Sequence, residues 1–231
     1  FRLGSLPLSG ADEPRYARIA QEMRAEGRWV TPILEGRPWL EKPPLYYWLT
    51  IPMRSVLGET ETAARMGPAI SAFAAALAVL WLGTKLWSRL AGLIAAAILI
   101  TSLGFAGFAR AASTDMPMTA CLTIALAIFA AAGAGKKVSW GTILCGYGFL
   151  GLAVLGKGPV ALILAAGSAL LFWCLDERGG SLRRWRVAPG LLVTLLVSAP
   201  WFWLAFRENG FAFVATFFIN HNLARYVSDI H

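Results

Sequence analysis

Residues 140–175 read WGTILCGYGFLGLAVLGKGPVALILAAGSALLFWCL, and Lys157 is the one charged residue among them. Two apolar runs, 140–156 and 158–175, meet at the Gly-Lys-Gly-Pro sequence that begins at Gly156. Glycine is frequent just after the end of a helix and proline at a helix start, so this junction predicts a turn between two helices. Each run is close to the ~20 residues that a helix needs to cross the hydrocarbon of a bilayer.

Outward from this pair, further apolar runs of similar length occupy residues 63–83, 90–109, 116–134 and 187–206. The composition agrees with a membrane protein, because 57% of the residues are hydrophobic and 15% are charged, whereas a soluble domain carries about 25% charged residues. We therefore expect an all-α, polytopic membrane protein with about six transmembrane helices over residues 61–206.

The net charge of +8 is distributed in a way that argues against nucleic-acid binding. The basic residues lie in short loops between the apolar runs, and such loops set membrane orientation through the positive-inside rule. The basic-rich side, expected to be cytoplasmic, carries Lys85, Arg89, Lys136, Lys137, Arg178, Arg183, Arg184 and Arg186. The opposite side carries Arg110, Lys157 and Arg207. Residues 1–60 and 207–231 are therefore expected outside the cytoplasm.

The segments outside the membrane contain their own helical patterns. Residues 13–26 place Tyr16, Ile19, Ala20 and Met23 on one apolar stripe, which predicts an amphipathic helix lying in the plane of the interface. A second interfacial segment is expected after Pro43-Pro44, and a third over about 210–227.

Three other sequence features are interpreted as structural. Cys121, Cys145 and Cys174 all lie inside apolar runs and are expected to be small core residues, not a disulfide or metal set. The G-x-G-x-x-G match at 146–151 and the G-x-x-x-x-G-K match at 151–157 both lie inside an expected membrane helix. Neither has the strand–turn–helix context that nucleotide binding requires, so we interpret these glycines as helix-packing positions.

The remaining polar residues share one expected location, outside the membrane, although they are far apart in sequence. They are Asp12, Glu13, Glu41, Lys42, Asp115, Lys157, His221 and Arg225. Each has an alternative explanation: Asp12 and Asp115 could cap helices, Lys157 could anchor a helix at the interface, and Glu41-Lys42 could be a solvated pair. His221 and Arg225, four residues apart, share a helical face. Together the set favours a common site.

Such a site has the charges needed to handle a phosphate at the membrane surface. A polyprenyl phosphate that leaves from a sugar does so as an anion, and Lys42, Lys157 and Arg225 could stabilise it. Asp12 could orient the sugar or act as a base for an acceptor hydroxyl. Glu41 with His221 could hold a divalent metal ion.

Several motifs resemble the bacterial 4-amino-4-deoxy-L-arabinose transferases of lipid A, which belong to the C-type glycosyltransferase superfamily together with protein mannosyltransferases. The resemblance rests on Asp-Glu-Pro-Arg-Tyr-Ala from Asp12, on Glu-Lys-Pro-Pro-Leu-Tyr-Tyr-Trp-Leu from Glu41, and on Thr114-Asp115-Met116-Pro117. It continues through Lys157-Gly158-Pro159 and the Phe-Phe-Ile-Asn-His-Asn-Leu-Ala-Arg-Tyr run from Phe217. These motifs span nearly the whole chain in the family's order.

The resemblance implies a set of roles. It implies an inverting transfer of a sugar from a polyprenyl-phosphate donor to lipid A or another acceptor, on the outer side of the bacterial inner membrane. It implies that Asp12 is catalytic, and we add Asp115 and Lys157 to the catalytic set. Lys42 and Arg225 would contact the lipid phosphate, and we place Tyr46 with them. A divalent metal ion would be held near Glu41 and His221.

Two further expectations concern the extent of the chain and the rival functions. The chain starts at Phe1 without Met, and the resemblance implies a membrane helix before residue 1 and more helices and a domain after residue 231. The same superfamily includes protein O-mannosyltransferases, which are the first alternative. A transporter is the second, although transporters place polar groups near the bilayer midplane and often show inverted repeats.

Overall fold

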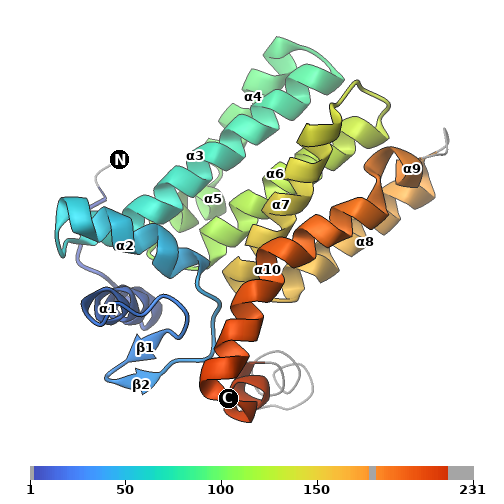
Figure 1. Ribbon diagram of the computed structural model, residues 1–231. Coiled ribbons are helices and arrows are strands. Elements are labelled where there is room, and N and C mark those ends of the chain that lie inside the picture. The colour runs from blue at the N-terminus through green and yellow to red at the C-terminus, as the bar shows by residue number, and fades with distance from the viewer. Residues whose placement is uncertain (1–2, 177–180, 218–231) are drawn as a thin grey trace, which may run out of the picture.

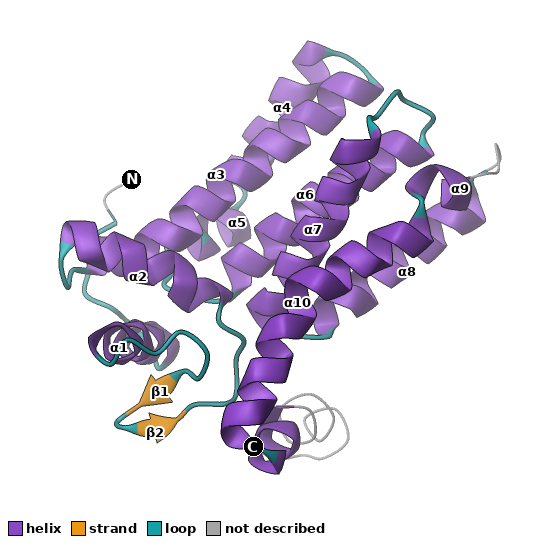
Figure 2. Ribbon diagram, viewed as in Figure 1, coloured by secondary structure: helices purple, strands orange, loops and turns teal. Residues whose placement is uncertain are grey.

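The computed structural model describes residues 3–176 and 181–217 (Figure 1). Helices dominate these ranges, and one short hairpin supplies the strands that are seen there (Figure 2). The bundle comprises α3 (Glu61–Leu86), α4 (Arg89–Thr101), α5 (Leu103–Phe108), α6 (Asp115–Gly133), α7 (Trp140–Lys157), α8 (Val160–Leu175), α9 (Ser181–Trp185) and α10 (Val187–Asn209). Outside the bundle are α1 (Asp12–Ala25), β1 (Ile33–Leu34), β2 (Arg37–Pro38), α2 (Leu45–Leu57) and α11 (Phe211–Phe213).

The expected all-α, polytopic membrane architecture is confirmed. Within the described ranges, α3, α6, α7 and α10 are long and apolar enough to cross a bilayer, while α4 and α8 are shorter apolar helices. The outer faces of the bundle expose large apolar side chains, such as Ile98, Leu171 and Leu195. Such faces suit a hydrocarbon solvent. Whether the number of membrane-spanning helices reaches the predicted six therefore depends on whether α4 and α8 are counted.

One predicted run is divided in the structure. Residues 90–109 form α4 and α5, which are separated at Ser102. The hydroxyl of Thr101 donates to the carbonyl of Ala97, and that of Ser102 donates to the carbonyl of Leu99. Hydroxyls that bond to the backbone in this way compete with the helical ladder and favour a break.

The bundle helices approach closely where glycines face their neighbours. A Cβ atom added at Gly92 of α4 would lie 2.4 Å from the carbonyl oxygen of Leu80 in α3. One added at Gly190 of α10 would lie 2.1 Å from the ring of Tyr147 in α7. The two rejected nucleotide motifs begin at Gly146 and Gly151, and both glycines lie within α7. Gly146 faces Ile128, and Gly151 faces Val197. These contacts are the small-residue packing expected between membrane helices.

The cysteines are free, as predicted, but only one lies partly inside the bundle. Cys121 has intermediate exposure, whereas Cys145 and Cys174 are exposed on the helix surface. The expectation that all three are core residues is therefore wrong for Cys145 and Cys174. Their sulfur atoms face outward from apolar helices, where a small apolar side chain is also tolerated.

The amphipathic stripe of residues 13–26 forms, but it packs on protein. In α1, Tyr16, Ile19, Ala20 and Met23 are all buried, and they form one cluster with the inner face of α2. Figure 1 shows α1 almost end-on while the long helices run across the picture, so α1 crosses their direction. The stripe therefore fastens α1 to α2 and does not serve as a lipid-facing surface.

Candidate functional site

Two residues from the expected polar set form an ion pair at one end of the bundle. The ammonium group of Lys157, the last residue of α7, donates to Oδ1 of Asp115, the first residue of α6. Both side chains are about one-third exposed, so the pair is accessible to a ligand. The residue at the N-cap position of α6 is Thr114, so Asp115 lies inside the helix, and its side chain pairs with Lys157.

Asp12 and Glu41 lie within electrostatic reach of Tyr16, as Asp115 does. Burial raises the pKa of Tyr16 to about 12, and the negative charges of Asp12, Asp115 and Glu41 add to the shift. Three carboxylates from three segments therefore act on one phenol. Asp12 is exposed and pairs with Arg15 at 3.3 Å, one turn further along α1. It lies inside α1 and forms no cap bond.

The segment that contains Lys42 is held against the ends of α7 and α10. Glu41 and Lys42 are half-buried, and Pro43 and Pro44 after them are buried. Leu45 then packs in one cluster with Leu155 and Phe217. The ring of Phe217 covers the turn after Lys157, because a Cβ atom on Gly158 would lie 2.7 Å from it.

The loop after α1 is fastened to the far end of α10 by hydrogen bonds. The indole of Trp201 donates to the carbonyl of Val30 at 2.9 Å, and the amide of Asn209 donates to the hydroxyl of Thr31 at 2.8 Å. Thr31 also donates to Glu208. The segments predicted to lie outside, on one side of the membrane, thus come together at one end of the bundle.

Sequence reasoning missed the most extensive polar contact of this end, that of Arg65 with Glu13. Arg65 donates to Glu13 through Nε at 2.9 Å and Nη2 at 2.8 Å, and both side chains are buried. Its remaining N–H groups donate to the carbonyls of Leu3, Leu6 and Pro7. Arg65 was counted within an apolar run; a lone arginine there signals a buried partner.

Glu13 in turn joins α1 to the turn before α6. Its carboxylate accepts from the backbone N–H groups of Ala112 at 2.7 Å and Ser9 at 2.9 Å. Burial acts to raise the pKa of Glu13, but the hydrogen bonds from Arg65, Ser9 and Ala112 outweigh it and lower the pKa to about 2. Glu13 is thus ionised at neutral pH and links α1, which begins at Asp12, to the turn before Asp115.

The placement of Tyr46 corrects one expectation. Tyr46 is fully buried, and its hydroxyl donates to the carbonyl of Ala64 at 3.0 Å. It packs edge-on against Tyr47, and burial raises its pKa above the usual value. The helical phase of α2 turns both tyrosines inward, so Tyr46 supports the fold and does not reach a lipid phosphate.

The two remaining site predictions, His221 and Arg225, lie outside the described residues. Within the described ranges, no three His, Cys, Asp or Glu side chains gather as a metal site. Glu41 alone of the expected metal pair is described. The arrangement near Asp115 and Lys157 offers partly exposed carboxylates and lysines at one end of the bundle, which suits binding of an anionic, lipid-linked group.

A bundle of membrane-length apolar helices with ionisable side chains gathered at one end defines a polytopic membrane protein with a polar site at one membrane face. Within that class, a sequence model of the dolichyl-phosphate-mannose-protein mannosyltransferase family matches residues 10–220. The chain belongs to this family.

Curated relatives narrow the likeness within the family. Undecaprenyl phosphate-alpha-4-amino-4-deoxy-L-arabinose arabinosyl transferase from Pectobacterium carotovorum is 32% identical over 97% of this chain and 41% of its own length. The protein of the same name from Pseudomonas savastanoi is 31% identical over 94% of this chain and 41% of its length. This chain therefore spans about 41% of the length of these relatives.

A solved structure matches the whole described fold. The crystal structure of ArnT from Cupriavidus metallidurans bound to undecaprenyl phosphate superposes with a TM-score of 0.92 and 28% sequence identity. The match covers 98% of this chain and 42% of that one. Its apo state gives a TM-score of 0.88 over 94% of this chain.

Proposed function

We propose that the protein carrying this chain is a glycosyltransferase that takes a sugar from a polyprenyl-phosphate donor. The specific donor we infer is undecaprenyl phosphate-linked 4-amino-4-deoxy-L-arabinose, and the acceptor lipid A or another molecule outside the cytoplasm. The relatives' names and the lipid bound in the ArnT structure support this proposal.

The single observation that carries the proposal is the Asp115–Lys157 pair, which lies beside the segment of Glu41 and Lys42 and near Asp12. An ammonium group at a membrane face can bind the phosphate of a lipid whose chain stays in the bilayer. Asp115 holds Lys157 in place before the ligand arrives, so less ordering is needed on binding.

The chemistry follows from the charges. An acceptor oxygen attacks the anomeric carbon, the bond from that carbon to the phosphate oxygen breaks, and the polyprenyl phosphate leaves with the electron pair. Lys157 and Lys42, with Arg225, stabilise the developing anion. Asp12 accepts the proton from a hydroxyl acceptor. With a phosphate acceptor, which is already ionised, Asp12 orients the sugar instead.

We also propose that Glu41 and His221 are ligands of a divalent metal ion. The described residues supply only Glu41 for it, so no step of the reaction is assigned to the metal. Metal analysis of the purified full-length protein, compared with its Glu41→Gln variant, tests this part. A metal content that is the same in both proteins would remove Glu41 from the ligand set.

The membrane side is also proposed. Loop charge places the basic residues near Lys85 and Lys137 in the cytoplasm, and so puts the Asp115–Lys157 end outside, at the inner membrane of a bacterium. The test is accessibility labelling in intact cells, in a variant whose native cysteines are replaced by alanine. An impermeant thiol reagent should label Asp12→Cys and not Lys136→Cys, and the reverse pattern would refute the orientation.

The test of the function is a transfer assay with the full-length protein in membranes and a defined polyprenyl-phosphate sugar. Asp12→Asn and Lys42→Met should each remove most of the transfer, whereas Glu26→Gln should leave it unchanged. Glu26 is the matched control, since it is an exposed carboxylate that pairs only with neighbouring Arg28 among the described residues. Normal transfer by both site variants would refute the proposal.

A second acceptor class is favoured by the family match itself. The matched family model is that of protein mannosyltransferases, so a hydroxyl on a peptide is the alternative acceptor. Offering lipid A and a serine- and threonine-rich peptide to the same membranes, with mannose-linked and aminoarabinose-linked donors, separates the two. A transporter would move the lipid-linked sugar across the bilayer without cleaving it.

A further inference from the structure

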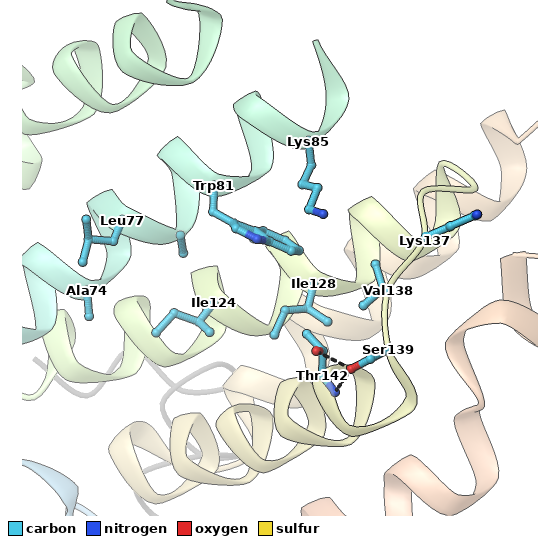
Figure 3. Close-up of a pocket in the computed structure, with 12 residues that line it drawn as sticks. Ala74, Leu77, Trp81, Lys85, Ile124, Ile128, Lys137, Val138, Ser139 and Thr142 are labelled. Atoms are coloured by element: carbon cyan, nitrogen blue, oxygen red, sulfur yellow. Dashed lines mark hydrogen bonds between the residues drawn. The ribbon is translucent and has the colours of Figure 1, made fainter. Parts of the chain in front are cut away.

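A pocket lies at the opposite end of the bundle from the Asp115–Lys157 pair. It is a cavity of about 470 Å³ between α3, α6 and the start of α7, and Figure 3 shows its lining. The lining residues are Ala74, Leu77, Ala78, Trp81, Lys85, Ile124, Ala127, Ile128, Lys137, Val138, Ser139 and Thr142. None of these residues belongs to the polar set of the proposed active site.

The pocket has a polar end and an apolar end. Figure 3 shows Lys85 and Lys137 at one end with Trp81, and Ala74 and Leu77 toward the other. Ser139 lies at the polar end, where its hydroxyl caps α7 by accepting from the N–H of Thr142 at 3.1 Å. The start of a helix adds a partial positive charge to that of the lysines.

The charge around this pocket is of one sign. The sequence contains no Asp or Glu between Glu61 and Asp115, and none between Asp115 and Asp176. Within the part of the chain that the structure describes, neither Lys85 nor Lys137 has an ion-pair partner. Both are exposed. The lysine end of the pocket is therefore positively charged and open to an anionic ligand.

The length of the whole pocket along α3, polar end included, suits one lipid molecule. On α3, the lining positions run from Ala74 to Lys85 along one stripe, which is about 16 Å of helix at 1.5 Å per residue. That length is close to one leaflet of a bilayer whose hydrocarbon core is about 30 Å thick. Tryptophan and lysine at the headgroup level complete the pattern, since both side chains favour the interface.

We propose that this pocket is a binding site for an anionic phospholipid, with the headgroup phosphate between Lys85 and Lys137 and one acyl chain along the stripe of α3. Basic pockets between membrane helices recognise such headgroups in this way. The occupant is a structural or regulatory lipid of the leaflet opposite the proposed active site, and not the polyprenyl-phosphate donor.

The experiment measures lipid retention by native mass spectrometry on the purified full-length protein, with phosphatidylglycerol and phosphatidylcholine supplied in equal amounts. The pocket variant is K85A/K137A. The matched control is R89A/K136A, which removes the same charge from exposed residues on the same side that do not line the pocket. Ala74→Phe fills the apolar part and leaves the charge intact. Thermal stability of each variant confirms folding.

The expected result is preferential retention of phosphatidylglycerol by the wild-type protein. Its apparent affinity should fall about 30-fold in K85A/K137A and also fall in Ala74→Phe, with R89A/K136A close to wild type. Equal retention of the two lipids, or an equal loss in R89A/K136A, would overturn the proposal. So would undiminished binding by Ala74→Phe together with equal binding of inorganic phosphate, which would mark a simple anion site.

Discussion

Glu13 and Arg65, which are 52 residues apart, form a buried two-point ion pair that ties α1 to the start of α3. Breaking a buried pair by removing one charge leaves the other uncompensated, at a cost of about 3–5 kcal/mol. We therefore expect Glu13→Gln to lower the free energy of unfolding by that amount. Chemical unfolding in mixed micelles measures it, and Arg18→Met, which changes an exposed arginine of the same helix, serves as the control.

The same pair predicts a pH dependence. Because the folded pKa of Glu13, about 2, lies below its ordinary value of 4.5, the ionised form stabilises the fold above pH 4.5. That contribution is lost as the pH falls from 4.5 toward 2. The difference in stability between wild type and Glu13→Gln should therefore be constant near neutral pH and shrink in that window. A difference that grows on acidification would contradict the assignment.

Lys157 should matter for transfer and not for folding. The loss of one group that stabilises a developing oxyanion costs about 100- to 1,000-fold in rate, so Lys157→Met should reduce transfer by that factor. Lys136→Met, at the other end of the bundle, should leave the rate unchanged. Rates within a few-fold of each other in the two variants would remove Lys157 from the catalytic set.

Glycine packing between α3 and α4 can be tested with a matched pair. A Cβ atom at Gly92 would overlap the backbone carbonyl of Leu80, whereas one at Gly167 of α8 meets nothing within 4 Å. Gly92→Ala should therefore destabilise the protein by about 1–3 kcal/mol. Gly167→Ala should be neutral or slightly stabilising, since alanine favours a helix. Thermal unfolding in detergent compares the two, and equal midpoints would contradict the close approach.

Tyr46 and Tyr47 should respond differently to loss of the hydroxyl. The Tyr46 hydroxyl bonds to Ala64, so Tyr46→Phe should cost about 1 kcal/mol. The buried Tyr47 hydroxyl has no partner among the described residues, so Tyr47→Phe should be neutral or stabilising. Both variants should keep the affinity for the polyprenyl-phosphate donor. Weaker donor binding by Tyr46→Phe alone would restore the original expectation of a lipid-phosphate contact.

The sequence predicted the helical bundle well because apolar runs near membrane length have one stable outcome in a bilayer. Loop charge also gathered Asp12, Glu41, Asp115 and Lys157 on one side, and the structure brings their segments together. The partner of Arg65 could not be predicted from the sequence. An arginine within an apolar run indicates that a buried carboxylate lies near it, but the run does not show that this carboxylate belongs to Glu13.

The prediction that Tyr46 contacts the lipid phosphate did not match its buried position for a different reason. A cluster of aromatic residues after two prolines is typical of an interfacial helix, and a helix does form there. Which aromatic side chains face inward depends on what packs against the helix, here α1 and the start of α3. The burial of Tyr46 and Tyr47 is thus a tertiary property that local composition does not carry.

The hydrogen bonds from Trp201 and Asn209 to the loop at Val30 and Thr31 impose an order of events during synthesis. The loop leaves the ribosome early, but its partners follow 171 to 178 residues later. At about 5–20 residues per second, the loop waits roughly 10 to 35 s, during which its polar backbone groups must be satisfied by water. The contacts between this loop and α10 therefore form only after α10 has been inserted, so this end of the bundle is completed later than the helices that precede α10.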